Sequence, residues 1–275
     1  MKPLPYPDGD RLVQVWNTYD TWRGHEVLDA LWDRIGLSYP EYQRWRTTQR
    51  SFDATAVLGT AFLPITGRGD PDEAPIGVAA ASLFGMLGAE PVRGRGFTEQ
   101  EQGAGAPQVT VISHEAWRDR YGSDPDILGQ VAQIADVPFE IIGVLPPRFV
   151  LQPAGQPGLE RHAMWVPLGG LGEDLNEGDH SYQGLGILSA GTTLEQAHAE
   201  TARILRGDAT PEQRGARLAY RKTEETGSAR APLLMLAGAV ALLLLISCGN
   251  FATADPGSVA LPRREAALQG GHMPD

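Results

Sequence analysis

The chain has 275 residues, of which 42 % are hydrophobic and 21 % are charged, a composition that argues against disorder along the whole length. Its formal net charge of −11 argues against a nucleic-acid-binding protein, because such a protein needs a basic face to neutralise phosphates. The single cysteine excludes an intramolecular disulfide framework and a zinc site built from cysteines.

In chain order, short strands and helices alternate through the first two hundred residues. Ser38 is the expected N-cap of an amphipathic helix over 39–46, and Thr193 is the expected N-cap of a helix over 194–206. Runs of β-prone residues on both sides of Asp136–Pro138 predict a hairpin. Two more helices are expected, over 82–88 and 114–121, and further strands are expected at 12–16, 76–80, 109–112, 164–168, 183–189 and 218–220. This alternation predicts a soluble part of α+β class, with mixed α/β elements.

An apolar segment near the C-terminus predicts a membrane anchor. The 24 residues from Ala231 to Ala254 carry no charge. As a helix they would span about 36 Å, which is enough to cross a hydrocarbon core of about 30 Å. We therefore expect a transmembrane helix over 231–254, preceded by a linker over 207–230 and followed by a short tail over 255–275. The alternative is a buried helix of a soluble domain.

The common catalytic and cofactor-binding motifs are absent from the sequence. There is no P-loop, no nucleophile elbow and no histidine spacing of the kind that ligates zinc. Acidic residues gather at 173–179, where calcium is one interpretation and a solvated loop is the simpler one. We therefore expect no catalytic residue, no cofactor and no metal site. A membrane-anchored hydrolase is disfavoured, because no nucleophile is accompanied by a base.

Short motifs along nearly the whole chain resemble one family, in the order in which that family has them. They are Pro3–Asp8, Ser38–Tyr42, Ala81–Phe84, Gly94–Thr98, Val111–Ser113, Tyr121–Pro125, Ile142–Phe149, Trp165–Leu168, Gly191–Ala197, Leu244–Asn250 and Arg263–Glu265. The pattern is similar to the periplasmic core domain of MacB-type ABC transporter permeases, within the FtsX-like superfamily. The resemblance implies a core domain over 1–206, with a βαβ-type porter lobe and a smaller β-rich lobe, followed by one transmembrane helix.

The resemblance also implies a function and partners. Members of this family are non-catalytic components of the inner membrane, used in efflux, export or mechanical signalling. They pair as dimers with a separate or fused ATPase. For this chain we expect an ABC ATPase subunit on a separate chain, a second permease copy and membrane lipid as partners. Arg263, Arg264 and Glu265 resemble the cytoplasmic exit of the second membrane helix, so they are candidates for coupling to the ATPase. Ordinary anchoring of a membrane helix at the lipid interface is the other interpretation of these three residues.

Two questions stay open at this level. The family's first and later membrane helices are not recognisable here, so we expect either a truncated permease component or a membrane-tethered binding or scaffold domain that partners an intact permease. The family places this domain outside the cytoplasm. The positive-inside rule places it in the cytoplasm, because only Arg263 and Arg264 follow the apolar segment, whereas four basic residues lie within about 15 residues upstream of it: Arg217, Arg221, Lys222 and Arg230.

Overall fold

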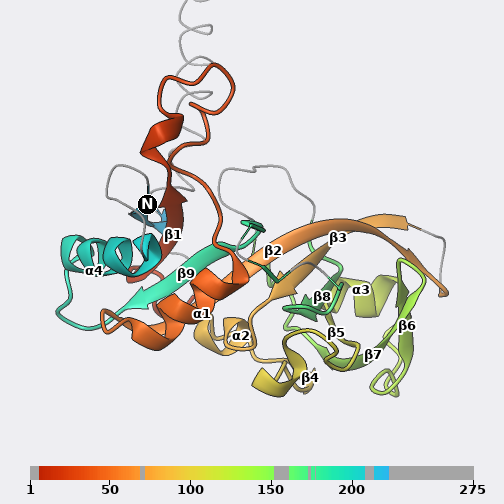
Figure 1. Cartoon of the computed structure of the whole chain (residues 1–275). Coiled ribbons are helices and arrows are strands. Elements are labelled where there is room, and N and C mark those ends of the chain that lie inside the picture. Colours follow the sequence, from red (N-terminus) through yellow and green to blue (C-terminus); the bar gives the residue numbers. More distant parts are fainter. Residues whose placement is uncertain are drawn as a thin grey trace, which may run out of the picture. The chain divides into compact units, whose positions relative to one another are not determined.

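The chain divides into two compact units, Met1–Ser228 and Ala229–Asp275. The computed structural model describes parts of the first unit, namely residues 6–68, 72–151, 161–172, 175–176, 178–207 and 214–222 (Figure 1). The transmembrane helix expected over 231–254 and the coupling candidates Arg263, Arg264 and Glu265 lie outside these residues. Within the described ranges, no helix is both long enough and apolar enough to span a membrane.

The described residues form one mixed sheet, with strand order β10-β1-β9-β2-β3-β8-β5-β7-β4 and with β6 paired to both β2 and β7. The strands are β1 Leu12–Thr18, β2 Phe52–Thr66, β3 Asp72–Ala79, β4 Arg93–Gly94, β5 Val109–Ile112, β6 Val131–Ile134, β7 Val137–Val144, β8 Met164–Pro167, β9 Gln183–Leu188 and β10 Gly215–Tyr220. The β3/β8 and β5/β7 pairs are parallel, and the other pairs are antiparallel. The predicted α+β class is therefore confirmed.

The helices begin where the sequence provides caps. They are α1 Tyr39–Thr48, α2 Leu83–Met86, α3 His114–Asp119 and α4 Leu194–Arg206, with short 3₁₀ turns η1 Asp20–Trp22 and η2 Glu99–Glu101. Ser38 and Thr193 form capping boxes with Glu41 and Gln196, which lie three residues further on. In each box the side chain of one residue accepts a hydrogen bond from the backbone N–H of the other, so two N–H groups at the helix start are satisfied. α1 packs against α4 and β2, and α4 packs against β10 (Figure 1).

The long strand β2 connects the two ends of the sheet. Its first half pairs with β9, its second half pairs with β3, and its last two residues pair with β6. Figure 1 shows β2 running from the side of α1 and α4 to the side of β6 and α3. Aromatic contacts mark the core on both sides, with ring centroids 5.2 Å apart for Trp45 and Phe52 and 5.7 Å apart for Phe84 and Trp165.

The structure corrects details of the predicted elements. The hairpin turn comprises only Ala135 and Asp136, whose φ values of 47° and 63° fit a two-residue turn, so Val137 and Pro138 belong to β7. The strand expected at 12–16 extends to Thr18, and all seven of its residues are buried, so both faces of β1 are covered. The strand expected at 218–220 begins at Gly215 and pairs with β1, so this part of the segment 207–230 belongs to the sheet.

Candidate functional site

The first and last strands of the described chain lie side by side. β1 and β10 are antiparallel, with Val13 opposite Tyr220 and Thr18 opposite Gly215. The chain therefore enters β1 and leaves β10 at the same end of the pair. We call residues 10–13 and 220–222 the β1–β10 junction. An ion pair connects its two segments, with Nζ of Lys222 2.9 Å from Oδ1 of Asp10.

At the opposite end of this strand pair lies a buried carboxylate. Glu41 is 1 % exposed, and its Oε1 accepts a hydrogen bond from Nη1 of Arg214 over 2.8 Å. Its Oε2 accepts from Nδ2 of Asn17 over 2.8 Å and from the backbone N–H of Ser38 over 2.9 Å. Asn17 belongs to β1 and Arg214 directly precedes β10, so Glu41 fastens the start of α1 to both strands.

Two aromatic groups complete this arrangement, which we call the Glu41 cluster: Asn17, Tyr19, Glu41, His180 and Arg214. Nδ1 of His180 lies 3.3 Å from Oε2 of Glu41, and Nε2 of His180 lies 3.1 Å from the Tyr19 hydroxyl. The same hydroxyl accepts a hydrogen bond from Nη2 of Arg214 over 2.6 Å. The Arg214 guanidinium also lies 5.0 Å from the centre of the Tyr19 ring, within the range of a cation–π contact.

The electrostatics of the cluster favour the ionised carboxylate. Burial on its own would raise the pKa of Glu41, but His180 and the hydrogen bonds from Ser38 and Asn17 outweigh burial, so the pKa lies below its usual value. Burial also raises the pKa of Tyr19. The ionised carboxylate keeps its contacts with Arg214, Asn17 and the backbone of Ser38, so the cluster connects the start of α1 to the β1–β10 strand pair.

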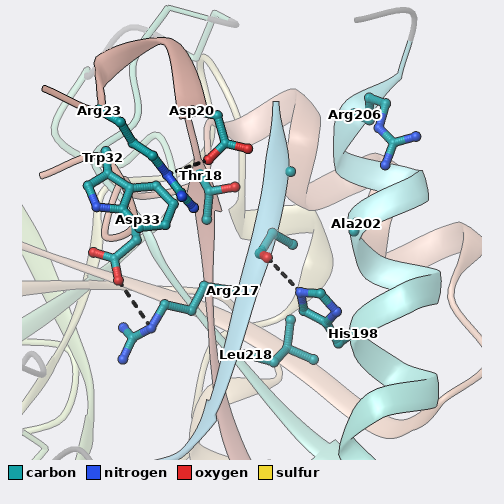
Figure 2. Close-up of a pocket in the computed structure, with 12 residues that line it drawn as sticks. Thr18, Asp20, Arg23, Trp32, Asp33, His198, Ala202, Arg206, Arg217 and Leu218 are labelled. Carbon is teal, nitrogen blue, oxygen red and sulfur yellow. Dashed lines mark hydrogen bonds and ion pairs between the residues drawn. The ribbon is translucent and has the colours of Figure 1, made fainter. Parts of the chain in front are cut away.

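A cavity of about 430 Å³ lies beside this strand pair, between β10, α4 and the segment 20–33, which begins with η1 and is called the η1 region (Figure 2). Small residues leave the space open, because Ala202 on α4 and Gly215 and Ala216 on β10 all line it. A volume of this size is in the range of small-molecule sites, which usually run from about 300 to 1,000 Å³.

Two ion pairs line one side of the cavity. Nε of Arg23 lies 2.8 Å from Oδ1 of Asp20, and its guanidinium stacks 3.7 Å from the centre of the Trp32 ring. Nε of Arg217 lies 3.4 Å from Oδ2 of Asp33 (Figure 2). Each of these two guanidinium groups is therefore balanced by a neighbouring carboxylate.

The facing side is a row of residues on α4. His198, Ala202 and Arg206 are spaced four apart and lie along the same side of the helix (Figure 2). Nε2 of His198 lies 2.9 Å from the backbone oxygen of Ala216. A carbonyl oxygen only accepts, so Nε2 carries the proton, and this bond fixes the ring against β10.

Sequence reasoning named neither the Glu41 cluster nor the cavity. The spacing of His198, Ala202 and Arg206 on a correctly predicted helix was the available signal for the cavity. Within the described part of the chain, no group of histidine, aspartate and glutamate side chains is arranged to hold a metal. Three of the four acidic residues in the segment 173–179, where calcium is one interpretation, lie outside the described residues: Glu173, Asp174 and Glu177.

A sequence model described as the MacB-like periplasmic core domain matches residues 3–204, which is most of the chain. The chain belongs to this family. A search of curated proteins finds no match. The MacB-like domain can therefore be compared further only with solved structures, which share its fold at low sequence identity.

Three such structures are similar to this MacB-like domain. The periplasmic region of MacB from Actinobacillus actinomycetemcomitans has a TM-score of 0.57 at 14 % identity, covering 80 % of this chain and 92 % of its own. A domain of a putative permease from Porphyromonas gingivalis has a TM-score of 0.55 at 14 % identity, covering 78 % and 92 %. The extracellular domain of the ABC-type transporter YknZ from Gram-positive bacteria has a TM-score of 0.53 at 15 % identity, covering 75 % and 99 %.

Proposed function

We propose that this chain is a non-catalytic permease component of an ABC-type transporter or mechanotransmission complex for efflux or export, with its MacB-like domain on the outer side of the inner membrane. Family membership supports the class of protein. The observation that supports mechanical transmission is the β1–β10 junction. The chain enters the first described strand and leaves the last one at this same end of the strand pair. A domain moved by membrane helices needs such an arrangement.

The junction suits the transfer of movement into the sheet. A displacement of either connecting segment acts on two strands that are hydrogen-bonded to each other and to β9. β9 pairs with β2, and β2 continues to β3 and β6 at the far end of the sheet. The Glu41 cluster fixes α1 to the same strand pair, so strands and helix would move as one body.

The remaining parts of the proposal concern residues outside the described ranges. The apolar segment 231–254 would anchor the chain as a single membrane pass, and Arg263, Arg264 and Glu265 would contact the ATPase. The partners would be an ABC ATPase subunit on a separate chain, a second permease copy and membrane lipid.

Co-purification tests this proposal. The tagged full chain, produced in its own organism and extracted in detergent, should come from the membrane fraction together with an ABC ATPase subunit identified by mass spectrometry. The double variant R263A/R264A should lose the ATPase while remaining in the membrane. The matched control is R118A, because Arg118 is exposed and pairs only with its neighbour Asp119 among the described contacts. A chain found in the soluble fraction, or one that brings no ATPase, would contradict the proposal.

The second candidate function is a membrane-tethered binding or scaffold domain that partners an intact permease. The cavity beside β10 favours it, because a domain that only transmits movement has no need for a pocket of ligand size. The same co-purification separates the two functions. A binding or scaffold domain should bring an intact permease chain with it, and its recovery should not change in R263A/R264A.

A further inference from the structure

The cavity beside β10 contains an unbalanced positive charge. Among the described residues, three guanidinium groups line it, from Arg23, Arg206 and Arg217, but only two carboxylates do, from Asp20 and Asp33. Those two carboxylates pair with Arg23 and Arg217. Within the described part of the chain, Arg206 makes no ion pair, and its Nε is buried without a hydrogen-bond partner. This excess is local, because the whole chain has a net charge of −11.

The positions of the lining groups define which ligand chemistry fits. Arg206 and His198 stand on α4, at one side, while Trp32 lies at the other side behind the stacked guanidinium of Arg23 (Figure 2). Leu218 of β10 adds an apolar surface. A guanidinium presents N–H groups in a fork that matches the oxygens of a carboxylate or a phosphate. The cavity therefore offers a charged end and an apolar body.

We propose that this cavity binds a small organic anion, with one carboxylate or phosphate group on an apolar body, and that Arg206 is the residue that selects the charge. The oxyanion accepts hydrogen bonds from the Arg206 guanidinium, and the apolar body packs against Leu218 and the stacked Arg23–Trp32 pair. Inorganic anions are too small to use these apolar surfaces. Cations are disfavoured, because the two carboxylates are already paired. This inference does not rest on the transport role.

Titration calorimetry on the full chain in detergent tests the proposal. The probes are benzoate and phenyl phosphate, which carry the two anionic groups on the same ring, with benzyl alcohol as the uncharged analogue. We expect at least one of the anions to bind and benzyl alcohol to bind about ten-fold more weakly or not at all, since a hydrogen bond to a charged group contributes roughly this factor. Equal binding of the neutral probe, or no binding of either anion, would overturn the proposal.

Arg203 provides a matched control. It stands one turn before Arg206 on α4, is exposed and does not line the cavity. R206Q should weaken anion binding about ten-fold or more, and R203Q should leave it unchanged. A202L, which fills the cavity between His198 and Arg206, should abolish binding. Equal effects of R203Q and R206Q on anion binding would mean that general surface charge attracts the anion, and this would contradict a specific site at Arg206. If R206Q does not fold, the single variants R206K and A202L provide the same test. Lysine keeps the positive charge of Arg206 but lacks the forked N–H groups of the guanidinium.

Discussion

Arg214 donates a hydrogen bond from Nη1 to Oε1 of Glu41 over 2.8 Å, joining residues that are 173 positions apart in the chain. Glu41 is 1 % exposed and the Arg214 side chain is 25 % exposed, so this contact pairs a buried carboxylate with a partly buried guanidinium, at the point where α1, β1 and β10 meet. The fold therefore depends on a residue that directly precedes its last described strand.

We expect R214A to lower the free energy of unfolding by about 3 kcal/mol, because it leaves the buried Glu41 carboxylate without its cationic partner. Urea unfolding of the full chain in detergent measures this. Tryptophan fluorescence reports on the first unit alone, since all six tryptophans lie between Trp16 and Trp165. The exposed-pair variant R118A should change stability by no more than about 0.5 kcal/mol. Equal effects of the two variants would contradict a structural role for the Glu41 cluster.

The lowered pKa of Glu41 predicts a loss of stability in acid. In the unfolded chain this carboxyl has its usual pKa near 4.5, and in the folded chain its pKa is lower. Its stabilising contribution is therefore fully present above the unfolded pKa and is lost as the pH falls through the folded pKa. Unfolding measured from pH 6 to pH 3 should show a shallower loss in E41Q than in the wild type. D119N, at an exposed ion pair, serves as the control. An unchanged slope in E41Q would contradict the prediction.

His162 predicts a second pH dependence, in a higher window. Burial lowers its pKa from 6.5 to about 4, although a hydrogen bond with the backbone of Leu151 acts in the opposite direction. As the pH falls from 6.5, the unfolded chain takes up a proton that the folded chain refuses, so stability falls until the pH reaches about 4. The loss amounts to about 3 kcal/mol for this group. H162Q should remove this part of the slope between pH 6.5 and 4.5, and a slope equal to that of the wild type would exclude His162 as its source.

Gly77 of β3 allows a close contact with the parallel strand β8. A Cβ at this position would lie 2.2 Å from Cε3 of Trp165, a fully buried side chain. G77A should therefore destabilise the domain by about 1–3 kcal/mol through overpacking. G96A is the matched control, because a Cβ at Gly96 would meet its nearest neighbour, Phe84, at an ordinary 3.7 Å. Thermal unfolding of both variants checks the difference, and equal melting temperatures would contradict it.

Local signals in the sequence predicted local structure. Ser38 with Glu41 and Thr193 with Gln196 mark helix starts by a spacing of three residues, and the structure confirms both caps. The length of β2 could not be predicted in this way. It contains Gly59 and Pro64, and its three partner strands hold it extended.

The candidate site was hidden for a related reason. Glu41 belongs to the helix predicted over 39–46, but its partner Arg214 is distant in sequence, so nothing local marked Glu41 as buried and charged. The cavity depends on the η1 region lying opposite α4 across β10, which is a property of the tertiary structure (Figure 2). The small residues that line it, Ala202 on α4 and Gly215 and Ala216 on β10, are common in helices and strands, so nothing in the sequence marks them as lining a cavity.

The most direct test of the central claim is the side of the membrane on which the MacB-like domain lies. Val27 is 72 % exposed, so V27C in a C248S background provides a single accessible thiol in that domain. Spheroplasts would be treated with a membrane-impermeant maleimide before and after lysis. An extracytoplasmic permease domain predicts full labelling before lysis. Labelling only after lysis would place the domain in the cytoplasm, as the basic residues upstream of 231–254 suggest, and would contradict the account.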